Sequence, residues 1–187
     1  MDMFKNVNAN LQDFVRAARL CLNADLVLPC VALIFSAIDQ LAYLDRAPEH
    51  KDVKRDDFIR WVDTYLLPGS GLNCSAIDLY GARCGVLHSQ SPESRLSRQG
   101  EAKQLCYARV GTTREEFQEF ADRLGYDAIA VHPEELLKAL IAAENKFGTH
   151  INETPDKAWL VAERASVLFA RVRPEEMTPN SSVRADC

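Results

Sequence analysis

At 187 residues the chain is long enough to bury a substantial core in one large domain. Its composition, 47% hydrophobic and 26% charged, is that of a globular protein and excludes a chain that is disordered throughout. The net charge of −5 excludes a protein that coats nucleic acid through overall positive charge, because such binding depends on Lys and Arg neutralising phosphates. Any contact with RNA or DNA must come from a local basic site.

The sequence also indicates where the protein resides. The N-terminus does not have the form of a signal peptide. The most apolar run, Leu26 to Ile38, is about two thirds of the length that a bilayer span requires, so it predicts a buried helix and no membrane association. Six cysteines without paired spacing indicate reduced thiols. We therefore expect a cytoplasmic protein.

The first half of the chain predicts four helices joined by short links. Asn10 is expected to cap the first helix, and Pro29 fits the first turn of a second, more apolar helix. A third, amphipathic helix contains residues 58–66 and is stopped by residues 68–71, which include Pro68 and two glycines. The fourth spans about 75–89. Four helices with short links predict an up-and-down bundle.

Beyond residue 89 the pattern changes to short strands and further helices. A strand, a helix and a strand follow one another within about 30 residues, which is the length of a βαβ unit, so the two strands are expected to pair in parallel. The helix between them is expected to turn Phe117, Phe120 and Leu124 inward. The predicted elements are strands 104–110 and 127–131, and helices that begin at Thr112 or Thr113, at His132 and at Thr154.

The fourth helix carries an arginine and a histidine five positions apart, Arg83 and His88. Ser75 is expected to be its N-cap, with Asp78 near the exposed amides of the first turn. On a helical wheel one apolar stripe is formed by Ile77, Tyr80, Cys84 and Leu87.

His88 projects onto this stripe, next to Gly81 and Gly85. Arg83 lies about 140° away from His88 around the helix, at the other margin of the stripe. Glycine permits another backbone to approach closely. The pattern therefore predicts a helix that admits a neighbouring chain segment beside its histidine.

This pattern resembles the HEPN superfamily (higher eukaryotes and prokaryotes nucleotide-binding domains). The mark of that superfamily is an arginine, four to six residues, and a histidine on a helix of an α-helical bundle. Arg83 and His88 match with four residues between them, and the resemblance covers about residues 8–110. It implies metal-independent RNA cleavage by a homodimer, without a cofactor, in a toxin or phage-defence setting in which an antitoxin or another partner protein can take part.

The expected fold class is mainly α. Residues 1–110 are expected to form a HEPN-like up-and-down helical bundle that carries the motif. Residues 111–173 are expected to form a C-terminal helical extension packed on it, and residues 174–187 a flexible tail. A small two-stranded, parallel β element accompanies the helices.

The resemblance assigns roles to the two motif residues. A 2′-hydroxyl would attack the neighbouring phosphate while His88 moves the proton, and Arg83 would stabilise the charge that builds on phosphorus. The alternative for His88 is a core histidine that is hydrogen-bonded to a backbone carbonyl. Because the two side chains project from different faces, either a bend at Gly85 or a second copy of the chain would have to bring them together.

Asp39 is the third candidate catalytic residue, because it interrupts an otherwise apolar helix. A carboxylate that is buried alone is costly, so we expect it to pair with Arg83 or His88. Alternatively, residue 39 lies at a solvated helix end.

Two further sets of residues are candidates for binding. Arg95 and Arg98 follow the motif and could bind flanking phosphates of a nucleic acid, or could be ordinary surface residues. Gly81 and Gly85 are candidates for a subunit interface, or for close packing inside one bundle.

Two function classes follow. The first is a metal-independent ribonuclease, and the alternative is a catalytically inactive HEPN-like module that binds nucleotide, RNA or a partner protein. Arg83 and His88 favour the enzyme. Cys84 favours the alternative, since many active members carry Asn, Asp or His directly after the arginine. A zinc site is not expected, because no pair of cysteines with C-x2-C spacing is present.

Overall fold

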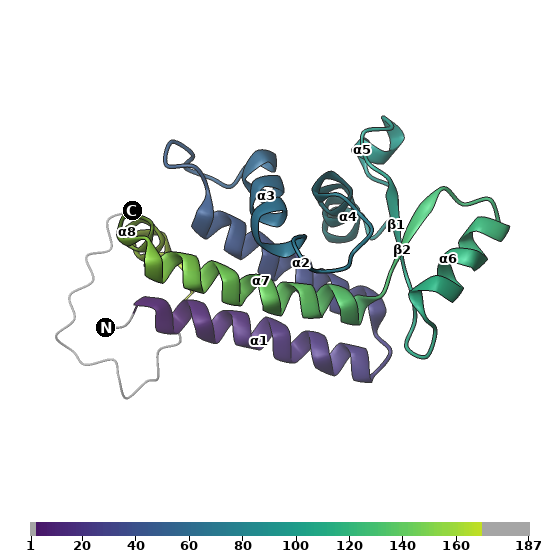
Figure 1. Ribbon diagram of the computed structural model, residues 1–187, viewed down its shortest axis with the longest axis horizontal. Coiled ribbons are helices and arrows are strands. Elements are labelled where there is room, and N and C mark those ends of the chain that lie inside the picture. Colours follow the sequence, from purple (N-terminus) through teal and green to yellow (C-terminus); the bar gives the residue numbers. More distant parts are fainter. Residues whose placement is uncertain (1–2, 170–187) are drawn as a thin grey trace.

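The computed structural model describes residues 3–169, which form eight α-helices, one π-helical segment and a two-stranded sheet. The expected mainly α fold with a small parallel β element is confirmed. The elements are α1 (Met3–Asn23), α2 (Val27–Asp45), α3 (Arg55–Trp61), η1 (Val62–Leu66), α4 (Ala76–His88), α5 (Arg95–Arg98), β1 (Gln104–Tyr107), α6 (Arg114–Arg123), β2 (Ala128–Val131), α7 (Pro133–Glu153) and α8 (Pro155–Ala165). In Figure 1 the long helices α1 and α7 run alongside each other, and the sheet with α6 extends from one end of the helical body.

The apolar helix α2 is the centre of the core and contacts α1, α3, α4, α7 and α8. Each large side chain that it buries stabilises the fold by roughly 1.5–3 kcal/mol before conformational entropy is counted. By length and composition α2 could also cross a membrane, so the expectation that its apolar run is too short was wrong. The expected buried helix is confirmed. Its buried residues are Cys30, Val31, Ile34, Phe35, Ala37, Ile38, Leu41, Ala42 and Leu44.

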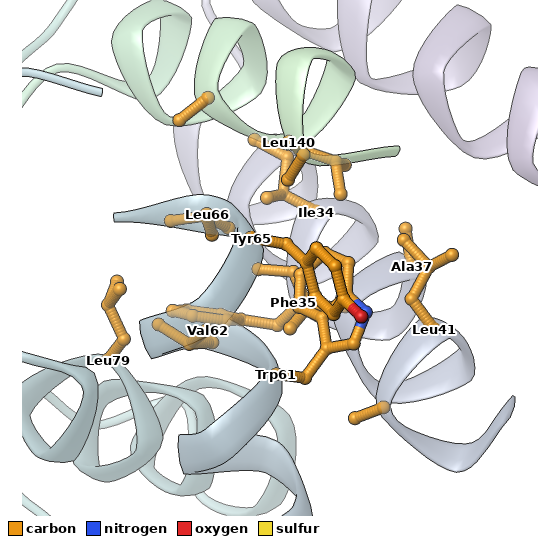
Figure 2. Packing of buried hydrophobic residues seen from close by; sticks show 14 of the residues in the cluster. Ile34, Phe35, Ala37, Leu41, Trp61, Val62, Tyr65, Leu66, Leu79 and Leu140 are labelled. Carbon is orange, nitrogen blue, oxygen red and sulfur yellow. The ribbon is translucent and has the colours of Figure 1, made fainter. Parts of the chain in front are cut away.

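Aromatic side chains from α3 and η1 fill the space between α2 and α7. Trp61 and Tyr65 lie 5.6 Å apart between ring centroids, and Tyr65 lies 5.2 Å from Phe147 of α7. Figure 2 shows Trp61 and Tyr65 in the buried cluster that also contains Phe35 of α2. The predicted third helix is therefore present, but its second half is a π-helix, with the amide of Leu67 bonded to the carbonyl of Val62.

A polar network holds α8 against this aromatic group. Lys157 donates to Asp45 at 2.5 Å and to the hydroxyl of Tyr65 at 2.9 Å. The same hydroxyl lies 2.7 Å from Nδ1 of His150. Helices α7 and α8 thus contribute to the same core as α2, and this core crosses the boundary that was expected at residue 110.

The sheet pairs Gln104 with Ala128 and Tyr107 with Val131 in parallel register. Gln118 of α6 covers the outer edge of β2. Its side-chain amide donates to the carbonyl of Ala128 at 2.9 Å and accepts from the amide of Ala130 at 2.7 Å. The Gln118 side chain thereby takes the place of a third strand. It forms hydrogen bonds with backbone groups of β2 that would otherwise be open to pairing with another strand.

The apolar side of α6 was predicted wrongly. Phe120 is 48% exposed and Leu124 is 56% exposed, and Ala121 is the buried residue of this helix. The two-stranded sheet covers only the side of α6 that carries Gln118 and Ala121. Phe120 and Leu124 therefore stay exposed to solvent.

Two helix boundaries also differ from the prediction. Helix α1 begins at Met3, so Asn10 lies inside it and is not a cap. Its side chain instead donates to the carbonyl of Phe169 at 3.1 Å. Helix α8 ends at Ala165, seven residues before the expected end at Val172. That expected end, like the expected tail 174–187, lies outside the described residues.

A buried carboxylate organises the loop between α2 and α3. Asp57 is 1% exposed, and it accepts hydrogen bonds from the amides of Ala47 and Lys54 at 2.9 Å each. Nδ1 of His50 lies 2.7 Å from its second oxygen. Burial alone would raise the pKa of Asp57, but the two amides and His50 outweigh burial and lower the pKa below its usual range. Asp57 therefore holds this loop as a carboxylate.

We expect Asp57→Asn to lower the free energy of unfolding by about 2–3 kcal/mol at neutral pH, because an amide nitrogen then faces a backbone N–H. A carboxyl whose pKa is lower in the folded state stabilises the fold above its unfolded pKa of about 3.9 and loses that contribution as pH falls through the folded value. Urea unfolding should therefore show the difference between wild type and variant shrinking below about pH 4. Asp56→Asn, at the exposed neighbour, is the control and should change far less. A difference for Asp57→Asn that persists unchanged at low pH would contradict this assignment.

Candidate functional site

Helix α4 begins as its sequence predicts. The hydroxyl of Ser75 accepts from the amide of Asp78 at 3.3 Å, and the Asp78 carboxylate accepts from the Ser75 amide at 2.9 Å. Asp78 also accepts from the amide of Lys103 at 2.7 Å. The capping box thus fixes both the start of α4 and the approach to β1.

The buried face of α4 is not the predicted one. Leu79 points into the core (Figure 2), and Ala82 is also buried, whereas the expected stripe of Ile77, Tyr80, Cys84 and Leu87 is only partly buried. His88 is the last residue of the helix and is exposed, so neither its expected place in the apolar stripe nor the alternative of a core histidine is correct. The imidazole is open to a ligand from solvent.

Asp39 of α2 and Arg83 of α4 form a two-pronged ion pair. Nε of Arg83 lies 2.9 Å and 3.1 Å from the two oxygens of Asp39, and Nη2 lies 2.6 Å from Oδ2. The two side chains are 22% and 20% exposed. The pairing expected for Asp39 is therefore confirmed, and one edge of the guanidinium is fixed by it.

The other end of the guanidinium meets the histidine. Nη1 of Arg83 lies 3.0 Å from Nε2 of His88. A guanidinium has no acceptor, so Nε2 must accept this hydrogen bond, and the proton of the neutral imidazole must be on Nδ1. Asp39, Arg83 and His88 thus form one hydrogen-bonded chain.

A single copy of the protein brings the motif residues together. The two Cα–Cβ directions differ by about 140° around the helix, but the long side chain of Arg83 runs along α4 to reach the terminal residue His88. Neither a bend at Gly85 nor a second copy is therefore needed for this contact.

Burial affects both members of the ion pair. It is the largest influence on Asp39, whose pKa is raised by burial although Arg83 and, less strongly, His88 act in the opposite direction. Burial by itself would lower the pKa of Arg83, but Asp39 outweighs burial and raises it. Arg83 is therefore a permanent cation at this position.

Two neighbours of Arg83 were not predicted as part of the site. Tyr80 and Cys84 lie close enough to influence each other and Arg83 electrostatically. The guanidinium of Arg55 lies over the Tyr80 ring, 5.9 Å from its centre. Tyr80 lies three residues before Arg83 and four before Cys84, and these helical spacings are the signal that could have identified Tyr80 and Cys84.

The two glycines of α4 accommodate a segment of the same chain. A Cβ atom at Gly85 would lie 2.4 Å from the carbonyl oxygen of Ser91, and one at Gly81 would lie 3.2 Å from Ser94 and from Ala102. The close approach predicted for these positions is real, but residues 91–102 make it. The reason for placing Gly81 and Gly85 at a subunit interface is thereby removed, while the homodimer itself stays a prediction.

The fold does not bring Arg95 and Arg98 into the ion-pair chain. Both lie on the short helix α5 and are exposed. Arg98 is 3.8 Å from Glu93, and no contact of either arginine with Arg83 or His88 occurs within residues 3–169. Their role in binding nucleic acid stays a prediction.

The chain was compared with protein-family models, with curated proteins and with solved structures, and none of them matches. The resemblance to the HEPN superfamily therefore depends on Arg83, His88 and their helical context alone.

The glycine contact gives a direct test of the packing behind the site. Gly85→Ala should lower the free energy of unfolding by about 1–3 kcal/mol, because the new methyl group collides with the backbone of Ser91. Gly148→Ala is the matched control, since that helical position in α7 has no atom within 4 Å of the added Cβ. It should stabilise the protein by about 0.5–1 kcal/mol. Equal effects of the two variants in urea unfolding would contradict the packing at Gly85.

Proposed function

We propose that this protein cleaves single-stranded RNA without a metal ion, with His88 as the acid/base and Arg83 as the group that stabilises the phosphate. The observation that carries the proposal is the 3.0 Å contact between Nη1 of Arg83 and Nε2 of His88 at an exposed helix end. A neutral imidazole nitrogen can transfer the proton in RNA transesterification, and a fixed guanidinium at hydrogen-bond distance can stabilise the charge that develops on the phosphate.

Binding of substrate would exchange one partner of Arg83. A phosphate oxygen is a stronger acceptor for a guanidinium than a neutral imidazole, so Nη1 would turn to the phosphate. That exchange frees the lone pair on Nε2 of His88 to accept the proton of the 2′-hydroxyl. The bond between O2′ and phosphorus forms as the bond to the 5′-oxygen breaks, and the protonated His88 then gives its proton to the leaving 5′-oxygen, which returns the imidazole to its neutral form.

The products would be a 2′,3′-cyclic phosphate and a 5′-hydroxyl. No metal or cofactor enters this scheme, because the imidazole moves the proton and the guanidinium carries the charge. Asp39 would act as a positioning residue, since it holds Nε and Nη2 and leaves Nη1 for the substrate. It has a positioning role rather than the catalytic role that the sequence suggested.

The HEPN resemblance supports the same reaction, and the toxin or phage-defence setting depends on that resemblance only. The alternative is a catalytically inactive HEPN-like module that binds nucleotide, RNA or a partner protein. It is favoured by Cys84 in the position directly after the motif arginine. The two functions differ in one measurable property, which is turnover.

We expect the purified protein to cleave single-stranded RNA in the presence of EDTA and to leave 2′,3′-cyclic phosphate ends. Loss of positioned acid/base catalysis costs about 10²–10⁴-fold, so His88→Ala should lose activity by that factor. Arg83→Ala should lose at least as much, because charge stabilisation is of similar size. Asp39→Asn should keep part of the activity, since Arg83 remains charged but is held less firmly.

The matched control is His150→Ala, which removes a histidine from α7 and should leave cleavage unchanged after identical purification. This variant also reports any contaminating nuclease. All variants must keep the wild-type helical circular dichroism signal. If a broad panel of RNAs survives the wild type, or if His88→Ala cuts as fast as His150→Ala, the enzyme proposal is wrong. Binding of RNA or nucleotide without cleavage would then support the catalytically inactive module.

A further inference from the structure

The outer face of α6 is apolar and has no partner within residues 3–169. Phe120 and Leu124 are about half exposed, and the rings of Phe117 and Phe120 stack with centroids 6.4 Å apart. These three residues lie one turn apart along one side of the helix. An exposed stripe of large apolar side chains indicates an interaction surface.

The fold holds α6 away from the helical body of the protein (Figure 1). Helix α6 packs on β2 through the adjoining side, where Gln118 bonds to the strand and Ala121 is buried. Phe117 lies nearest to this packed side and is partly buried, whereas Phe120 and Leu124 are exposed. Figure 1 shows α6 at the far end of the molecule, beyond the sheet and clear of the helical bundle. Another molecule could therefore approach the stripe without meeting α1 or α7.

The edge of the stripe beside Phe120 carries a negative charge at the start of α6 and a positive charge at its end. Glu116 is in the first turn of α6 and Arg123 is in the last turn, seven positions later. Both are exposed. The Glu116 carboxylate caps the helix through Thr113, and Arg123 has no ion-pair partner among the described residues. Residues seven apart project from the same side of a helix, so the edge is acidic at one end and basic at the other.

We infer that the occupant of this face is a second copy of the chain, packed with its α6 antiparallel across a two-fold axis at Phe120. In that arrangement Phe120 meets its own copy, and Phe117 of each protomer meets Leu124 of the partner subunit. Glu116 of each protomer then lies opposite Arg123 of the partner subunit. The stripe and its charged edge are thus complementary to themselves, which is the requirement for a two-fold interface.

Other occupants fit this face less well. In a parallel arrangement about a two-fold axis along the helices, the charged edges of the two copies would lie on opposite sides of the pair, so Glu116 and Arg123 would not meet. Nucleic acid is disfavoured by the exposed carboxylates Glu119 and Asp122 on the same helix. An antiparallel pair also sets the acidic first turn of each helix against the basic last turn of the other, and each charge is already favourable for its own helix end.

This interface is distinct from the one that the sequence suggested at Gly81 and Gly85. It would also leave Arg83 and His88 of each copy open to solvent, because α4 does not take part. The inference does not depend on the proposed ribonuclease activity, and its test does not use RNA.

The wild type should be a dimer at tens of micromolar in light scattering and sedimentation velocity. Phe120→Glu should weaken dimerisation by roughly 30-fold or more, because it removes the central contact and sets two carboxylates on the axis. Gln118 and Ala121 stay untouched, so α6 remains attached to its sheet. Phe169→Glu is the control, since that residue is 94% exposed elsewhere on the molecule, and it should dimerise as the wild type does.

A pair of charge reversals tests the antiparallel register. Glu116→Arg and Arg123→Glu should each weaken self-association by roughly tenfold, because each sets like charges opposite one another at two places. An equimolar mixture should form heterodimers, since every opposed pair is then of opposite charge. Misfolding of either variant could not produce this recovery.

Three results would overturn the inference. A wild type that stays monomeric at tens of micromolar would show that another partner, or none, covers α6. A Phe120→Glu variant that dimerises like the wild type would place the interface elsewhere. Charge-reversed variants that fail to recover association when mixed, although Phe120→Glu is monomeric, would exclude the antiparallel register.

Discussion

The carboxylate of Asp39 lies on the central apolar helix α2 and must be paired with a cation, and this constraint organises the site. Asp39 interrupts the buried surface of α2, and desolvation would make it costly without the two-pronged hydrogen bond from Arg83. The pair joins α2 to α4 and fixes one edge of the guanidinium. The remaining nitrogen, Nη1, then points along α4 to the exposed His88. The position of the arginine relative to the histidine therefore follows from the way in which the core satisfies one buried charge.

The end of α4 depends on a second constraint, the space left by its glycines. The chain turns back after His88, where Gln90 has a φ of 50°, and the carbonyl of Gly85 accepts hydrogen bonds from the amides of Ser89 and Ser91. A side chain at Gly85 would exclude this return. The glycines thus leave room for residues 91–102 to fold back beside α4, directly after the exposed His88.

Features with local causes could be predicted from the sequence. The capping box of Ser75, the start of α6 at Thr113 and the parallel strand pair all follow from residues close together in the chain. The Asp39–Arg83 pair could be predicted because burial of a lone charge is so costly. What the sequence could not show is which neighbour covers a given face. The stripe at Phe120 has the pattern of a core helix, but its sheet has only two strands, and the close approach at Gly85 is equally compatible with another chain or the same one.

The central claim is that Asp39 aims Arg83 so that it donates to Nε2 of His88. Nitrogen-15 NMR of the imidazole, recorded above about pH 8 where a histidine is neutral, tests it most directly. The account predicts that the proton of His88 is on Nδ1 in the wild type, and that Asp39→Asn and Arg83→Ala reduce this preference. A wild-type His88 with its proton on Nε2, or a tautomer that does not change in either variant, would contradict it.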